Sequence, residues 1–319
     1  MNDLSALILP QLSAGQPLES MPGIYRLTSI QHNDLSNHRH EHDAYLFHEK
    51  ASIRVRWVSD HIDTRLKHGV LVAVRWKNNS TCDHGAINVH RISLVEHPVP
   101  WLNLFHTIPP GWVKDRELIT HAATLIETLP KTHQMLFNAI FWSGDRMRRY
   151  CTGPSSMHGH HASRNGNLRH AVDVAQGIQH TCHERDFGNT AIGILAGLLH
   201  DAGKADEYML KENGDWGMTT RGKLLGHKIT IIEWIAVARA MSNPRMDENH
   251  YQALLHCLSS SASAPKWLGI RKPAMIEATL LNSHDRISGL ENLMLHQSKP
   301  GSGWGRYHKH LGGEPFVVR

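Results

Sequence analysis

The sequence predicts a two-domain protein in which a small all-β barrel precedes an all-α domain. The chain has 319 residues, of which 40% are hydrophobic and 20% charged. That composition is typical of a globular protein with room for two ordinary cores. Short alternating apolar and polar runs fill residues 20–96, as in strands, whereas apolar residues recur at helical spacing from Asp115 onward.

Three strands are expected in the first part. The segment Tyr45 to Trp57 alternates from Ile53 onward, so Ile53, Val55 and Trp57 share one face. Residues 69–76 and 86–94 have the composition of two further strands. Several short strands joined by polar turns favour a small barrel.

Prolines at 98, 100, 109 and 110 then predict a linker at residues 97–114, because proline continues neither a sheet ladder nor a helix. Asp115 is suited to cap a first helix that Pro130 ends, and a second helix runs from about Thr132 toward Tyr150. The expected parts are an N-terminal segment at 1–19, the barrel at 20–96, the linker at 97–114, the helical domain at 115–297 and an irregular tail at 298–319.

Metal-binding residue types recur through the helical part at intervals of 30, 27, 29 and 29 residues: His170, His200-Asp201, His227, His256 and His284-Asp285. Each lies at or near the C-terminal part of an apolar helical run. The caps expected for these helices are Asn189 or Thr190, Asp247, and Pro273 in a first turn. Helices that each offer an imidazole or carboxylate inward make a metal site.

The residues around these positions resemble a known family. Residues 154–170 (PSSMHGHHASRNGNLRH), 195–204 (LAGLLHDAGK) and 219–227 (TTRGKLLGH) are similar to the HD-domain metal-dependent phosphohydrolases. Within that superfamily they resemble the YhaM-type 3′-5′ exoribonucleases, whose pattern is P-A-A-K-x-x-H-H-x-Y-x-G-G-L-L-E-H. The positions that match it are Pro154, His160, His161, Gly166, Leu168 and His170. A relaxase-associated HD domain of conjugative elements has a similar opening segment.

The resemblance covers residues 115–296 closely and 20–95 loosely, and it implies an OB-like barrel followed by an α-helical HD domain. It further implies that a divalent ion (Mn, Mg, Fe or Zn) is held by His170, His200, Asp201 and Asp285. His227 and His256 would then face a second metal or the substrate. The expected catalytic residues are Asp201, which activates water, Lys204, which meets a phosphate or is simply solvated, and His160 and His161, which bind a phosphate or order their loop.

The chain departs from these relatives after His256. Ser259, Ser260 and Ser261 stand where two-metal enzymes of the superfamily have a histidine pair. One metal ion is therefore expected rather than two, and altered or lost activity stays open. Met157, Ser163 and Asn165 replace the usual Lys, Tyr and Gly, which predicts a different positioning of the substrate.

The β domain offers a candidate surface for single-stranded nucleic acid. Arg54, Arg56 and Arg75 would contact phosphates while Tyr45 and Phe47 stack on bases. Alternatively Phe47, Trp57 and Trp76 belong to the barrel core, which we favour for Trp57. A net charge of +5 and a pI near 9.0 fit a polyanionic partner, but the excess is too small to decide the question.

These features predict a metal-dependent phosphodiesterase acting on single-stranded nucleic acid, most simply a 3′-5′ exonuclease, RNA favoured, that releases 5′-mononucleotides. An HD phosphohydrolase of small nucleotides, or a nucleic-acid-binding accessory protein of a mobile element with an impaired HD site, are the alternatives. The N-terminus lacks the basic start of a signal peptide, and no window has the roughly 18 apolar residues of a membrane span. A cytoplasmic location without membrane contact is expected, and a homo-oligomer is left open.

Overall fold

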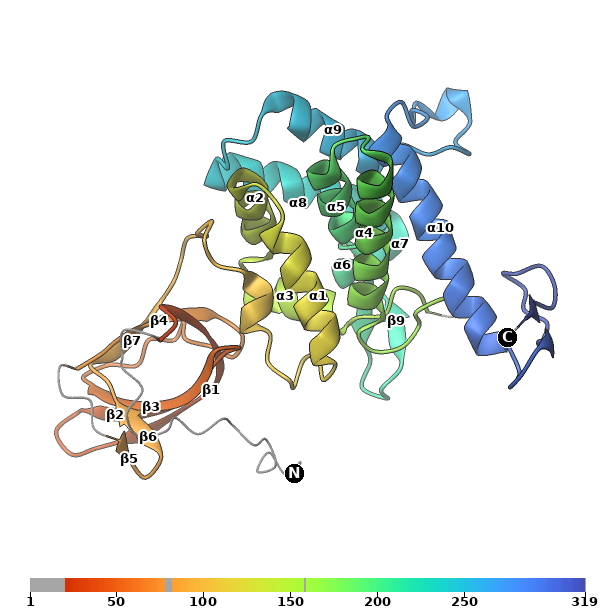
Figure 1. Cartoon of the computed structure of the whole chain (residues 1–319). Helices are drawn as coiled ribbons and strands as arrows, with labels where there is room; N and C mark the ends of the chain where they lie inside the picture. Colours follow the sequence, from red (N-terminus) through yellow and green to blue (C-terminus); the bar gives the residue numbers. More distant parts are fainter. Residues whose placement is uncertain (1–20, 78–81, 158, 319) are drawn as a thin grey trace.

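The computed structural model describes residues 21–77, 82–157 and 159–318, so the expected N-terminal segment at 1–19 lies outside it. A twisted sheet forms one side of the molecule and a group of helices the other (Figure 1). No helix among the described residues is both long and apolar enough to cross a membrane.

The predicted barrel is wrong, because the sheet is mixed and does not close. Its strands are β1 (Ile24–Asp34), β2 (His40–His48), β3 (Ala51–Ser59), β4 (Leu71–Arg75), β5 (Cys82–Asp83), β6 (Ala86–Asn88) and β7 (Arg91–Leu94). They lie in the order β5-β6-β3-β2-β1-β4-β7, with β3 and β6 parallel and the other pairs antiparallel. The end strands β5 and β7 have two and four residues, too short to provide a ladder that joins the two edges.

The alternation expected in β3 is confirmed, since Ile53, Val55 and Trp57 are buried on the inner face of the sheet. Two other features differ from the expectation. The segment predicted as one strand from Tyr45 is a hairpin, in which β2 and β3 pair antiparallel around Glu49 and Lys50. The long strand β1 was not predicted, because its second half, TSIQHND, carries few apolar residues.

Ten α-helices lie after the sheet in the described chain. They are α1 (Arg116–Glu127), α2 (Lys131–Phe141), α3 (Gly144–Thr152), α4 (Gly166–Arg185), α5 (Thr190–Leu199), α6 (Lys204–Glu207), α7 (Thr220–Leu224), α8 (Gly226–Ser242), α9 (Glu248–Ser259) and α10 (Ile276–Gln297). The predicted caps Asp115, Asn189 and Asp247 each accept a hydrogen bond from the first turn of their helix. Pro273 lies before α10, whose N-cap is Met275.

The C-terminal part is not all-α, because it contains two antiparallel hairpins. One joins β8 (Tyr208–Leu210) to β9 (Trp216–Met218), and the other joins β10 (Gly303–Trp304) to β11 (Phe316–Val317). The second hairpin occupies the segment expected to be an irregular tail. The helix expected from Thr132 to Tyr150 is interrupted after Phe141 and forms α2 and α3.

The sheet and the helices share a core. Ile24 and Leu71 of the sheet belong to the same buried cluster as the helical core, and a second cluster lies inside the sheet. The proline-rich stretch 97–114 contains the short 3-10 helix Leu104–Thr107 and contributes Leu104, Phe105 and Trp112 to that core. It therefore packs as part of the helical core.

A buried arginine holds this junction. The Arg26 side chain is fully buried, and its guanidinium donates to the Gly69 carbonyl at 2.8 Å and to Thr107 Oγ1 at 2.8 Å. It also lies 5.1 Å from the centre of the Trp112 ring. Burial without a carboxylate partner lowers the pKa of Arg26 to about 10, so its charge is stabilised by carbonyl, hydroxyl and ring contacts.

Candidate metal centre

Helices α4, α5 and α10 pack against one another (Figure 1), and the predicted ligands lie on them or directly after them. His170 lies on the buried face of α4, His200 and Asp201 follow the end of α5, and Asp285 lies on α10. The α4–α5 approach requires a glycine, because a Cβ on Gly197 would lie 2.8 Å from the Cα of Ala175. The apolar sequence of α5 thus places its polar end at the centre of the helical group.

His170 lies close to each of the other three predicted ligands. His170 Nε2 lies 3.1 Å from Asp285 Oδ1, 3.2 Å from His200 Nε2 and 3.5 Å from Asp201 Oδ2. His200 Nε2 lies 3.6 Å from Asp201 Oδ2 and 3.8 Å from Asp285 Oδ1. At metal–ligand distances of about 2.1 Å, neighbouring ligands are separated by about 3.0 Å at right angles and about 3.4 Å at tetrahedral angles.

Both imidazoles are oriented by their other ring nitrogen. His200 Nδ1 lies 2.7 Å from the Gly197 carbonyl, which can only accept, so this nitrogen carries the proton and leaves the Nε2 lone pair for a metal. His170 Nδ1 lies 3.0 Å from Ser288 Oγ. Ser288 was not predicted, although it lies one helical turn after Asp285 on the same face of α10.

The side chains of Asp201 and Asp285 are both ionised. Burial acts to raise the pKa of Asp201, but Lys204 and the imidazoles of His200 and His170 outweigh it and hold that pKa well below its usual range. Burial also acts to raise the pKa of Asp285, but the hydrogen bond to His170 together with the neighbouring imidazoles lowers it. The Asp285 side chain is 48% exposed while that of His170 is fully buried, so the centre opens to solvent on the α10 side.

Lys204 lies inside the centre. Its ammonium is 2.5 Å from Asp201 Oδ2 and 3.3 Å from Ser155 Oγ, and its side chain is largely buried. It therefore compensates the charge of Asp201, and in this arrangement it is engaged with that carboxylate.

His227 borders the centre and is held by a residue that was not predicted. Its Nε2 lies 3.4 Å from Asp201 Oδ1, and its Nδ1 lies 2.8 Å from Glu207 Oε2. Burial acts to raise the pKa of Glu207, but the hydrogen bond to His227 lowers it, so the carboxylate is charged and fixes the imidazole. The one sequence signal that could have indicated Glu207 is its position one helical turn after Lys204.

His160 lies beside the predicted metal ligands, whereas His161 is bonded to α10. Ligand atoms of His160, His170 and Asp285 lie within 4.8 Å of one another, and Gly289 on α10 leaves room for the His160 ring. Burial and the neighbouring His170 lower the pKa of His160 to about 4, so it is neutral at pH 7. His161 is tied to α10, because its backbone N–H donates to Asn292 Oδ1 at 2.8 Å and its Nε2 lies 3.2 Å from Ser288 Oγ.

His256 has a different environment. Its Nε2 accepts the backbone N–H of Ala274 at 2.9 Å, which ties α9 to the segment before α10. Within the described part of the chain, the residue groups able to hold a metal do not include His256. The periodic spacing alone gave no information on this contact.

The predicted phosphate contacts of the sheet are engaged with carboxylates. Arg54 donates two hydrogen bonds to Asp43, at 2.8 and 2.7 Å, and Arg56 donates one at 3.2 Å. Burial acts to raise the pKa of Asp43, but these hydrogen bonds lower it, so the carboxylate is charged and compensates both arginines. Asp43 faces Arg56 across the β2–β3 ladder, which the sequence alone did not reveal.

The two predicted stacking residues of this surface each lie beside an arginine, and the third predicted arginine is exposed. The Arg54 guanidinium lies 5.4 Å from the Tyr45 ring centre, and Arg116 lies 5.6 Å from that of Phe47. Arg75 is exposed at the end of β4. The outer face of β2 and β3 therefore carries cations and rings that already have partners.

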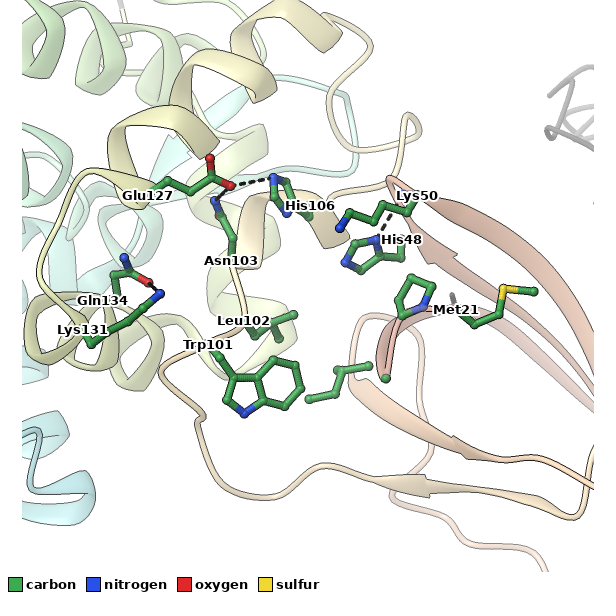
Figure 2. A pocket seen from close by; sticks show the side chains of 13 residues that line it. Met21, His48, Lys50, Trp101, Leu102, Asn103, His106, Glu127, Lys131 and Gln134 are labelled. Carbon is green, nitrogen blue, oxygen red and sulfur yellow. Dashed lines mark hydrogen bonds and ion pairs between the residues drawn. The ribbon is translucent and has the colours of Figure 1, made fainter. Parts of the chain in front are cut away.

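A separate cavity of about 370 Å³ lies between the sheet and the helices α1 and α2 (Figure 2). Lys50, Trp101, His106 and Lys131 are among its lining residues, and none of the predicted site residues lines it. Glu127 in its wall is already bonded to Asn103 and His106, each at 3.2 Å. This cavity is distinct from the metal centre.

The buried group His170, His200 and Asp201 could hold a metal ion, and Asp285 adjoins it. Comparisons of the chain with protein-family models, with curated proteins and with solved structures find no match. Function is therefore inferred from the side chains of the centre and from the residue patterns around them.

Proposed function

We propose that the protein is a metal-dependent phosphodiesterase acting on single-stranded nucleic acid, namely a 3′-5′ exonuclease that prefers RNA and releases 5′-mononucleotides. The observation that carries the proposal is the convergence of His170, His200, Asp201 and Asp285 from three helices. The resemblance of residues 154–170, 195–204 and 219–227 to HD phosphohydrolases supports phosphoester chemistry over a purely structural ion.

The same four side chains would hold a Mn, Mg, Fe or Zn ion. Such an ion supplies a Lewis acid for the phosphate and lowers the pKa of a bound water toward neutrality. Asp201 places its Oδ2 toward His170 and His200 and its Oδ1 toward His227. The Glu207–His227 pair can bind a phosphate oxygen or donate a proton to the leaving oxygen.

One ion is proposed rather than two. His256 is bonded to the backbone of Ala274, so among the described residues a second ion between Asp201 and His227 would have these two side chains as protein ligands. His160 lies instead beside His170 and Asp285, on the side of the first ion. Two protein ligands are too few for tight binding of a second divalent ion unless substrate oxygens complete its shell.

Hydrolysis of small nucleotides is the second candidate. The pairing of Arg54 and Arg56 with Asp43 favours it, because a long substrate needs free cations along its path. A nucleic-acid-binding accessory role with an impaired centre is the third, and the serines at 259–261 favour it.

The test compares Asp201→Ala with Asp60→Ala, a residue directly after β3 whose side chain is 87% exposed. The two proteins are incubated with Mn²⁺ and with RNA and DNA oligomers labelled at either end. We expect Asp201→Ala to lose hydrolysis by at least about 100-fold while oligomer binding changes little, because the carboxylate serves the metal. Asp60→Ala should retain both properties.

Unchanged turnover of Asp201→Ala would remove this centre from the mechanism. Cleavage of nucleoside phosphates but not of oligomers by the unaltered protein would favour the second candidate. Oligomer binding without any hydrolysis in the presence of bound metal would favour the accessory role.

A further inference from the structure

The segment after α10 folds back as a fixed hairpin. The Gly305 N–H donates to the Pro315 carbonyl at 2.7 Å, and the Arg306 N–H donates to the Gln297 carbonyl at 2.8 Å. A Cβ on Gly305 would lie 2.5 Å from the Gln297 carbonyl oxygen and 2.9 Å from Pro315 Cγ. Residues 298–318, here called the C-terminal hairpin, are thus packed closely against the end of α10.

This hairpin exposes three large aromatic rings. Trp304, Tyr307 and Phe316 are 61%, 65% and 56% exposed. Trp304 and Phe316 contact each other edge to face, with ring centres 5.1 Å apart. Several exposed rings on one ordered element are typical of a surface that binds a partner.

The rings alternate with basic residues that have no ion pair. Lys299, Arg306 and Lys309 are exposed, and among the described residues none of the ion pairs involves them. His308 and His310 stand between them, and Glu314 is the single carboxylate of the segment. The C-terminal hairpin therefore has free positive charge, whereas Arg54 and Arg56 of the sheet are paired with Asp43.

Helix α10 connects this surface to the metal centre. It carries Asp285 and, 12 residues later, ends at Gln297, where the hairpin begins. At 1.5 Å per residue the separation along the helix is about 18 Å. That is the length of roughly five nucleotides of a strand stacked at a rise of about 3.4 Å. In Figure 1 the hairpin lies at the end of α10, on the side of the molecule away from the sheet.

We propose that the C-terminal hairpin binds single-stranded nucleic acid and presents it to the metal centre. Bases stack on Trp304, Tyr307 and Phe316, and phosphates contact Lys299, Arg306 and Lys309. Exposed rings interleaved with cations bind single strands with little sequence preference. The presentation to the metal centre rests on the proposed function, whereas the binding itself does not.

The experiment measures binding of a fluorescent 12-nucleotide RNA, and of the same sequence as DNA, by anisotropy in EDTA. We expect the double variant Trp304→Ala/Tyr307→Ala to raise Kd at least about tenfold, because each stacked base contributes about that much. Trp304→Tyr keeps a stacking ring and should stay within about threefold of the unaltered protein. Circular dichroism and the melting temperature check that each variant is folded.

A second variant tests the charges without touching a packed ring. Arg306→Gln/Lys309→Gln should flatten the dependence of log Kd on log salt by up to about 1.4, since each lost contact with a single strand contributes about 0.7. The matched control Arg54→Gln/Arg56→Gln, on the sheet, should leave the slope nearly unchanged because those arginines are paired with Asp43.

Unchanged Kd and slope in folded hairpin variants would overturn the proposal. It would also be overturned if the ring variant kept its Kd but altered the oligomeric state in light scattering, since the surface would then bind a second copy of the chain. These outcomes are separate from those for the proposed function, because binding is measured without metal and hydrolysis is tested with Asp201→Ala.

Discussion

At the scale of single residues, the contacts of the described histidines separate those that could bind a metal ion from the others. His170 and His200 each direct Nε2 into the centre because Nδ1 is engaged elsewhere. His256 shows the opposite case, in which Nε2 is already bonded to a backbone N–H. Spacing along the chain locates histidines on helices, but the loop that contacts His256 follows it by 18 residues and was not predictable from the spacing.

We expect Glu207→Gln to weaken catalysis while leaving the protein folded. The substitution keeps the size of the side chain but removes the charge that holds the His227 imidazole at 2.8 Å. Loss of such an orienting partner typically costs about 10- to 100-fold in activity or metal affinity. The measurements are kcat, KM and the pH profile of oligomer hydrolysis. If Glu207 positions His227, loss of its charge should change the dependence of the rate on pH.

The control is Glu212→Gln, on the exposed turn between β8 and β9, which should behave as the unaltered protein. An identical pH profile in Glu207→Gln would show that His227 needs no carboxylate and is a structural residue.

At the scale of elements, helices were predicted more reliably than strands. Helix α5 could be predicted from its Asn189 cap to His200, because the cap and the apolar run are local features. Closure of a sheet depends on which distant strands pair, and here β5 and β7 are too short to pair with each other. The prolines of residues 97–114 excluded regular structure but carried no information on burial, so Phe105 and Trp112 were not predicted as core residues.

We expect Gly144→Ala to destabilise the junction between the sheet and the helices. A Cβ at Gly144, the first residue of α3, would lie 1.8 Å from the carbonyl oxygen of Gly69 before β4, and backbone atoms on both sides leave little room to adjust. Overpacking of this kind costs about 1–3 kcal/mol. A lower melting temperature, measured by circular dichroism, is the expected result.

Gly111→Ala provides the matched control, because nothing lies within 4 Å of a Cβ at Gly111. Equal melting temperatures for the two variants would mean that the contact between Gly144 and Gly69 contributes nothing to stability.

At the scale of the whole molecule, the metal centre lies between two parts that differ in free charge. The sheet carries arginines compensated by Asp43, while the C-terminal hairpin carries exposed cations and rings. The grouping of His170, His200 and Asp201 was predictable because specific residue patterns surround them. The hairpin was not, because its strands have only two residues each and the glycine-rich composition of the segment indicated irregular structure.

The number of metal ions bound per chain tests the proposal of a single ion. We expect close to one divalent ion per chain after dialysis of the purified protein against metal-free buffer, measured by elemental analysis. A second ion between Asp201 and His227 would have these two protein ligands among the described residues, since His256 is bonded to Ala274 and serines occupy 259–261. Asp201→Ala should reduce the content well below one, because Asp201 is the buried carboxylate of the set. A content near two in the substrate-free protein would show that other residues complete a second site and that the one-ion proposal is wrong.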